Sequence, residues 1–236
     1  MNPLLLPIVA AQGARLRSRT ELLPPASGPT FGTIAVEEMS GAPLRVGVLG
    51  ESTAAGCGVD LHEDGFAGRL ARQLAVRAGR PVRWEVVGQH GATARRIRFR
   101  LLPQLGEDLD IAVLLAGVND VLTRRSPDQW GEHLSAILEG LSSRARHIAA
   151  SGIPRFDAFP SIPPLLGRYL TARAEALDAV SQRVVAQFPR VSWISTRDFG
   201  PMGSAFFSRD RFHPSAVGYD SWARVTANHL ERAGAV

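Results

Sequence analysis

Residues 111–116, IAVLLA, form a short run in which every side chain is apolar. Such a run is typical of a strand that is buried on both faces, as strands of parallel sheets are. Four further segments have strand-like patterns: 44–49, 82–87, 191–195 and, more weakly, 147–153. Segments with helical spacing alternate with them: 66–78, 93–105, 127–143, 165–188 and 216–232. This alternation predicts βαβ units and therefore an α/β fold, a three-layer αβα sandwich with about five parallel strands.

The chain has 236 residues, which suits one large domain with a short lead-in. We predict that residues 1–43 are an amino-terminal arm and lead-in that packs on a single domain formed by residues 44–236. The arm contains the apolar run PLLLPIVAA at 3–11, which is shorter than the roughly 20 residues of a membrane span. Arg15 and Arg17 follow this run, whereas the basic residues of a signal peptide precede its apolar run.

From the arm we expect no stable membrane insertion and a cytoplasmic protein. A secretion signal or a membrane-surface anchor is the alternative. The single cysteine, Cys57, fits a reducing compartment without demanding one. The sequence predicts nothing about oligomeric state.

Lysine is absent, so all 27 basic residues are arginines. Walker A phosphate loops, Schiff-base enzymes and protein kinases each need a lysine, and these classes are excluded. The net charge of +5 raises the pI to about 10.7 because few groups titrate between histidine and arginine. The arginines are mixed with acidic residues along the chain, whereas nucleic-acid binders cluster them. We therefore expect no nucleic-acid partner, with a non-catalytic arginine-rich binding module as the competing hypothesis.

Small and polar residues follow the predicted strands at four places. These segments are GESTAAG at 50–56, GQHGAT at 88–93, GVND at 117–120 and DRFHP at 210–214. Ligands of open parallel sheets bind beyond the carboxyl ends of the strands, where such segments meet. We expect the four segments to converge on one edge of the sheet.

The residue types in these segments suit nucleophilic catalysis. A serine hydroxyl needs a base to take its proton, and the base needs a third group to orient it. Ser52 would be the nucleophile, His213 the base and Asp210, three residues earlier, the orienting carboxylate. The backbone N–H groups of Ser52 and Gly91 and the side-chain amide of Asn119 would stabilise an oxyanion.

Each of these residues also has a simpler structural interpretation. Ser52 could cap a following helix, and Asn119 could be a turn residue that tolerates unusual backbone angles. His213 could lie in a loop before a helix, with Asp210 in its turn. Only the four segments taken together favour catalysis over these interpretations.

The four segments resemble the sequence blocks of the SGNH/GDSL hydrolases, a family of serine esterases and lipases. In this resemblance Ser52 is the nucleophile, Gly91 and Asn119 belong to the oxyanion hole, and Asp210 and His213 complete the triad. Glu51 stands where the family usually has aspartate. The resemblance covers about residues 45–232.

The resemblance implies a flavodoxin-like sandwich and an acyl-enzyme mechanism without cofactor or metal. It implies a small-molecule acyl ester as the partner, with acyl groups of small to medium length. A thioesterase or lysophospholipase, or a carbohydrate O-deacetylase, would use the same residues. The segment 156–166, FDAFPSIPPLL, is either a packed connection or one wall of the acyl pocket.

Overall fold

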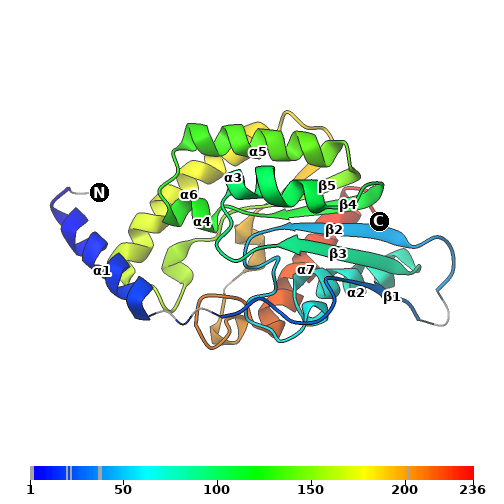
Figure 1. Cartoon of the computed structure of the whole chain (residues 1–236), viewed down its shortest axis with the longest axis horizontal. Helices are drawn as coiled ribbons and strands as arrows, with labels where there is room; N and C mark the ends of the chain where they lie inside the picture. Colours follow the sequence, from blue (N-terminus) through cyan, green and yellow to red (C-terminus); the bar gives the residue numbers. More distant parts are fainter. Residues whose placement is uncertain (1–2, 20, 22, 37–38, 201) are drawn as a thin grey trace.

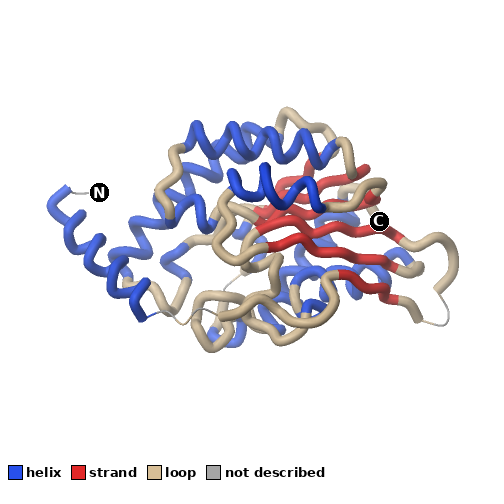
Figure 2. The backbone as a smooth tube through the Cα atoms, viewed as in Figure 1, coloured by secondary structure: helices blue, strands red, loops and turns tan. Residues whose placement is uncertain are grey.

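The computed structural model describes residues 3–19, 21, 23–36, 39–200 and 202–236, and its central layer is a twisted sheet in the order β1-β3-β2-β4-β5-β6 (Figures 1 and 2). The strands are β1 (Phe31–Ile34), β2 (Leu44–Gly50), β3 (Val82–Gly88), β4 (Leu109–Leu115), β5 (Ala145–Ser151) and β6 (Val191–Ile194). Strands β2 to β6 pair in parallel, and β1 adds an antiparallel edge beside β3. The predicted α/β sandwich with about five parallel strands is confirmed.

Helices cover both faces of the sheet (Figure 1). Helices α5 (Pro127–Ser142) and α6 (Pro164–Val185) pack together on one face, and α2 (Phe66–Ala78) and α7 (Ala216–Arg232) pack together on the other. Strand β4 contributes to both layers, because Ala112 and Leu114 lie in one buried cluster and Ile111 and Val113 in the other. This explains why the run 111–116 is apolar at every position.

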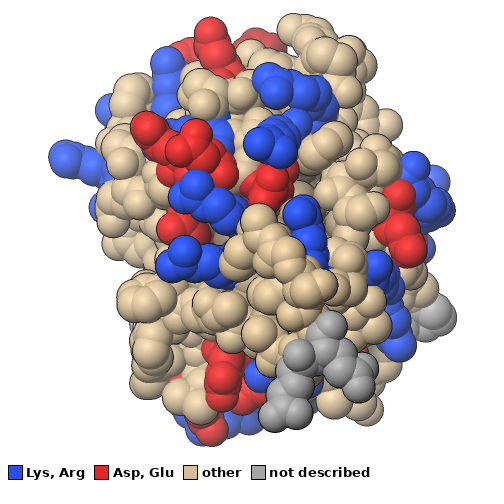
Figure 3. All heavy atoms as spheres, turned by 90° about the vertical axis from the view of Figure 1, so that its right-hand side faces the viewer, with Lys and Arg blue, Asp and Glu red and all other residues tan. Residues whose placement is uncertain are grey.

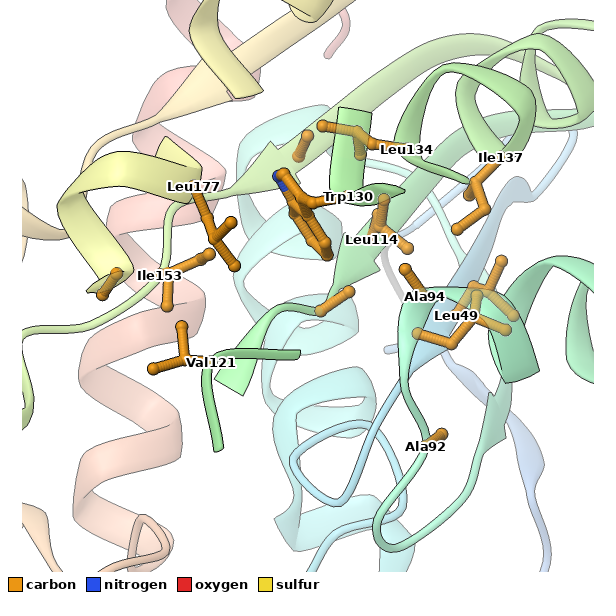
Figure 4. Packing of buried hydrophobic residues seen from close by; sticks show 14 of the residues in the cluster. Leu49, Ala92, Ala94, Leu114, Val121, Trp130, Leu134, Ile137, Ile153 and Leu177 are labelled. Carbon is orange, nitrogen blue, oxygen red and sulfur yellow. The ribbon is translucent and has the colours of Figure 1, made fainter. Parts of the chain in front are cut away.

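The cluster under α5 and α6 centres on Trp130 (Figure 4). The Trp130 Nε1 donates to Ser181 Oγ at 2.9 Å, so the indole is buried with its polar atom paired. Ala92, inside the predicted site segment 88–93, and Ala94 and Val121, which follow two of these segments, belong to the same cluster (Figure 4). The segments at the strand ends are therefore anchored in the core.

Three short elements differ from the sequence prediction. The expected helix over 93–105 is divided into α3 (Ala94–Arg96), a π-helical turn (Ile97–Leu101) and a 3-10 turn (Leu102–Gln104). Helix α4 (Val118–Leu122) follows β4 directly, although the sequence analysis did not predict a helix there. Strand β1 lies inside the segment that we interpreted as an extended lead-in.

The amino-terminal arm contains helix α1 (Leu6–Arg19), which lies beside α6 at the carboxyl end of the sheet (Figure 1). Residues 1–2, 20, 22 and 37–38 of the predicted arm and lead-in lie outside the described residues. The division of the chain at residue 44 stays a prediction. No helix in the described ranges is both long and apolar enough to cross a bilayer.

The face at the amino ends of the strands, opposite the site segments, carries interspersed basic and acidic side chains (Figure 3). Ion pairs join some of them, including Arg144 with Glu107 at 3.2 Å and Arg146 with Asp110 at 3.5 Å. On this face the arginines are mixed with carboxylates, as their spread along the sequence predicts.

Candidate active site

Ser52 lies two residues beyond the end of β2, in a series of turns. The turn packs tightly against the neighbouring strand, because a Cβ on Gly50 would collide with the Leu115 carbonyl oxygen and the Glu51 N–H donates to that oxygen at 3.0 Å. Helix α2 begins only at Phe66, so Ser52 caps no helix. The structure therefore does not support the helix-cap interpretation of Ser52.

Ser52, His213 and Asp210 form a continuous hydrogen-bonded chain. The Ser52 Oγ lies 2.9 Å from His213 Nε2, and His213 Nδ1 lies 2.6 Å from Asp210 Oδ2. Ser52 and His213 are 7% and 6% exposed, so the pair is buried but borders open space. This is the geometry in which a histidine can take the serine proton while a carboxylate stabilises the imidazolium.

The loop before α7 is shaped to hold Asp210. Arg211 adopts a left-handed conformation with φ of 58°, and the N–H groups of Phe212 and His213 both donate to Asp210 Oδ1 at 2.9 Å. Ser208 Oγ donates to the same oxygen at 2.9 Å. Burial alone would raise the pKa of Asp210, but the hydrogen bonds from His213 and the backbone outweigh it and lower the pKa to about 2.

The three predicted oxyanion donors, Ser52, Gly91 and Asn119, line the same open cleft. Gly91 has φ of 74° in a tight turn after β3, a conformation that favours glycine. Within the described part of the chain, the backbone N–H groups of Ser52 and Gly91 donate to no protein acceptor. Both are therefore available to a ligand in the cleft.

Glu51 holds the third donor. Its carboxyl oxygens accept hydrogen bonds from the Val118 N–H at 3.2 Å, the Asn119 N–H at 3.2 Å and Asn119 Nδ2 at 2.8 Å. An amide nitrogen carries two hydrogens, so one hydrogen of Asn119 Nδ2 is left for the cleft. Burial raises the pKa of Glu51 to about 7, although the hydrogen bonds from residues 118 and 119 oppose this effect.

Asp120 links the second and third segments. Its Oδ2 accepts the Ala94 N–H at 2.8 Å, at the start of α3, and its side chain is fully buried. Arg125 Nε lies 3.7 Å from the other carboxyl oxygen. Asp120 therefore fixes the turn that contains Gly91 relative to the helix that contains Asn119.

Two spaces meet at Ser52. One is a small pocket of about 60 Å³ with a largely apolar lining. Its apolar lining includes Leu115, Ala116, Phe159, Met202, Phe206 and Phe212. The other is an open cleft of about 620 Å³, which is lined by the oxyanion donors and by His90. His213 borders both spaces.

The segment 156–166 contributes to the packing and to the site at once. Phe156 is fully buried and stacks on Phe159, at a distance of 5.6 Å between ring centroids. Phe159 in turn lines the small apolar pocket. Leu166, at the other end of the segment, borders the open cleft. The segment is therefore a packed connection at Phe156 and part of the site lining at Phe159 and Leu166.

The sequence analysis missed two contributors to the site. Glu51 was recognised only as a departure from a family pattern, because its contact with Asn119 joins residues 68 positions apart. Helix α1 was predicted to pack on the domain, but its place along the cleft was not predicted. No sequence spacing encodes either contact, since both depend on the folded sheet.

Comparisons with known proteins show which structures share this fold. The lipase/acylhydrolase from Enterococcus faecalis has the same fold, with a TM-score of 0.61, 20% identity and coverage of 80% of this chain and 96% of that chain. Axe2, an acetylxylan esterase from Geobacillus stearothermophilus solved as a catalytic mutant, has a TM-score of 0.59, 15% identity and coverage of 81% and 95%.

A curated relative, the GDSL-like esterase Rv1075c of Mycobacterium tuberculosis, is 25% identical over 178 residues. The match covers 73% of this chain and 57% of the relative, so the chain spans less than two thirds of the relative's length. The model of the GDSL-like Lipase/Acylhydrolase family matches residues 48–220, a range that contains all four site segments. The chain therefore belongs to the GDSL-like lipase/acylhydrolase family.

Proposed function

We propose that the protein hydrolyses carboxylic esters of small to medium acyl groups through an acyl-enzyme on Ser52. The observation that carries this proposal is the chain of contacts from Ser52 to His213 and Asp210, at 2.9 and 2.6 Å, at the junction of an apolar pocket and an open cleft. Membership of the lipase/acylhydrolase family supports the same reaction class.

In the first half of this reaction, Ser52 Oγ attacks the ester carbonyl carbon while His213 Nε2 takes the hydroxyl proton. The negative charge that develops on the carbonyl oxygen is stabilised by the N–H groups of Ser52 and Gly91 and the amide of Asn119. The tetrahedral intermediate then collapses, and His213 gives its proton to the departing alcohol. The acyl group stays on Ser52.

In the second half, His213 takes a proton from water, and the resulting nucleophile attacks the acyl-enzyme carbonyl. Collapse of this intermediate returns the proton to Ser52 Oγ and releases the carboxylic acid. Asp210 keeps its negative charge throughout, since its pKa is lowered to about 2, and it stabilises the charged imidazole in both halves.

The two spaces suggest how the substrate divides. The alcohol must leave while the acyl group stays attached, so the alcohol portion needs a path to solvent. The larger, more polar cleft provides such a path, whereas the small apolar pocket suits an apolar acyl group that remains during the second half.

A carbohydrate O-deacetylase is the second candidate. An acetyl group would fit a pocket of about 60 Å³, and one protein of the same fold, Axe2, is an acetylxylan esterase. Chain length in the acyl group separates the candidates. A deacetylase would lose activity steeply beyond acetate, whereas a broader esterase would turn over longer p-nitrophenyl esters as well.

Labelling with a fluorophosphonate tests the nucleophile. We expect the wild-type chain to react once, at Ser52, and Ser52→Ala to abolish labelling and lower ester turnover by about 10³-fold or more. Ser143→Ala, at an exposed serine far from the site, is the matched control and should behave as wild type. Undiminished ester turnover in Ser52→Ala, or in His213→Ala, would overturn the proposed triad.

A further inference from the structure

Helix α1 lies outside residues 48–220, the range that matches the family, yet it forms part of the catalytic cleft. Its residues in the cleft lining include Val9, Ala10, Gly13, Ala14 and Leu16. The same cleft is lined by Ser52, His213 and the oxyanion donors. A segment absent from the family match therefore lines the same cleft as the reacting atoms.

The helix is attached to the domain by apolar and polar contacts along one face. Val9, Gln12, Gly13 and Leu16 follow the spacing i, i+3, i+4 and i+7, which places them on that face. Val9 is 4% exposed in the same core cluster as α5 and α6, and Leu16 packs against that cluster. Gln12 Oε1 accepts the Leu166 N–H at 3.1 Å, at the start of α6.

Gly13 is the gap in this face. Apart from the backbone of α1 and the two chain neighbours, no atom of the described residues lies within 4 Å of the position that a Cβ on Gly13 would take. Glycine in a helix interior costs about 1 kcal/mol relative to alanine, so helix stability does not explain its presence. What the missing side chain provides is room in the cleft between α1 and the catalytic residues.

Apolar side chains of two other elements line the same cleft. They are Leu122 of α4 and Leu166, Tyr169 and Leu170 of α6. An apolar group held among these side chains and α1 would be removed from water, which is favourable in proportion to the area buried. The polar lining consists of the catalytic centre and of charged or polar residues at the rim, Arg17, Glu21, Thr123 and Arg124.

We propose that α1 is one wall of a subsite that binds the apolar alcohol portion of the ester, and that Gly13 sets the width of this subsite. The proposal rests on the esterase function proposed above, in which the alcohol portion occupies the open cleft. Gly13 is then a specificity-determining residue that the family match does not include.

The test uses acetate esters with alcohols of different size, because all of them form the same acetyl-enzyme. Any effect of the alcohol subsite must then appear in acylation, as a change in kcat/KM. Ethyl acetate serves as the small substrate and 2-naphthyl acetate as the bulky apolar one. Gly13→Leu narrows the cleft, and Ala11→Leu adds the same bulk on an exposed position of the same helix that does not line the cleft.

We expect Gly13→Leu to lower the ratio of kcat/KM for 2-naphthyl acetate to that for ethyl acetate by at least about tenfold. Ala11→Leu should leave the ratio unchanged. Leu122→Ala removes bulk from the part of the cleft that α4 lines and should raise the ratio. This variant provides a test in the other direction should Gly13→Leu fold poorly.

An unchanged ratio of kcat/KM values in folded Gly13→Leu would overturn the proposal, even if both values fell by the same factor. It would also be overturned if Gly13→Leu changed the preference between p-nitrophenyl acetate and p-nitrophenyl octanoate instead, since the cleft would then bind the acyl chain. In each case wild-type turnover and fluorophosphonate labelling at Ser52 would stand, whereas their absence would contradict the esterase function itself.

Discussion

The side chain of Glu51 is buried, and burial disfavours the ionised form of its carboxyl group. Among the described residues it accepts hydrogen bonds from Asn119 and the backbone but pairs with no cation. Burial raises its pKa from 4.5 to about 7. A raised pKa means that the stabilisation relative to the unfolded chain is complete below about pH 4.5 and is lost as the pH rises through 7. The shift corresponds to about 3 kcal/mol, at 1.36 kcal/mol per unit.

Glu51→Gln removes this titration while keeping an oxygen that can accept from Asn119. We expect the free energy of unfolding of Glu51→Gln, measured relative to that of wild type, to increase by about 2–3 kcal/mol from pH 5 to pH 8. The variant gains relative stability because only wild type loses the stabilisation as the pH rises. Urea unfolding at the two pH values measures the difference. Glu139→Gln, at an exposed position on α5, should show no such change, and a flat difference for Glu51→Gln would contradict the raised pKa.

At the scale of elements, the site also depends on hydrogen bonds that join one turn to another. Asp120 at the start of α4 accepts the N–H of Ala94 in α3, and both residues are fully buried. Asp120→Ala would leave that N–H unpaired, which costs about 1–3 kcal/mol of stability. The turn that contains Gly91 would also lose its attachment to α4, so we expect kcat to fall.

Asp120→Asn distinguishes a positioning role from a simple loss of packing. Its amide oxygen can accept the Ala94 N–H, so we expect it to recover most of the stability and of kcat that Asp120→Ala loses. Thermal unfolding and p-nitrophenyl acetate kinetics on the two variants provide the measurement. Equal loss in both variants would show that the hydrogen bond to Ala94 is not what matters.

The elements also show which structural features a sequence can reveal. Helix α2 has the predicted bounds 66–78, because its apolar face is regular and Gly79 ends it in a left-handed conformation with φ of 62°. The expected helix over 93–105 is interrupted, and Pro103 lies in its last turn. Strand β1 has only four residues and no buried residue, so no apolar alternation marks it.

The site residues follow the same division. Ser52, Asp210 and His213 were predictable because two short motifs carry them, one at the end of β2 and one in the loop before α7. The support for Asn119 and Gly91 was not predictable. It comes from Glu51 and Asp120 through contacts between residues 68 and 26 positions apart, which only the register of the sheet determines.

At the scale of the whole molecule, Cys57 connects the first half of the chain to the last helix. The Tyr219 hydroxyl of α7 donates to the Cys57 carbonyl oxygen at 2.7 Å, across 162 positions, and both side chains are fully buried. Burial raises the pKa of the Cys57 thiol to about 11, and the negative charge of Asp210 adds to the effect. A buried, protonated thiol is a poor nucleophile.

Cys57 is the only cysteine, so its reactivity reports on one place in the fold. We expect the native protein to resist a disulfide reagent such as dithionitrobenzoate, and to react once per chain when it unfolds. Because Cys57 lies between the serine turn and α7, it should become accessible only when these two parts separate. The urea midpoint for thiol reaction should then coincide with the midpoint for loss of helical circular dichroism. A thiol that reacts at lower urea would show that the serine turn opens before the sheet, and that the halves of the catalytic site do not unfold together.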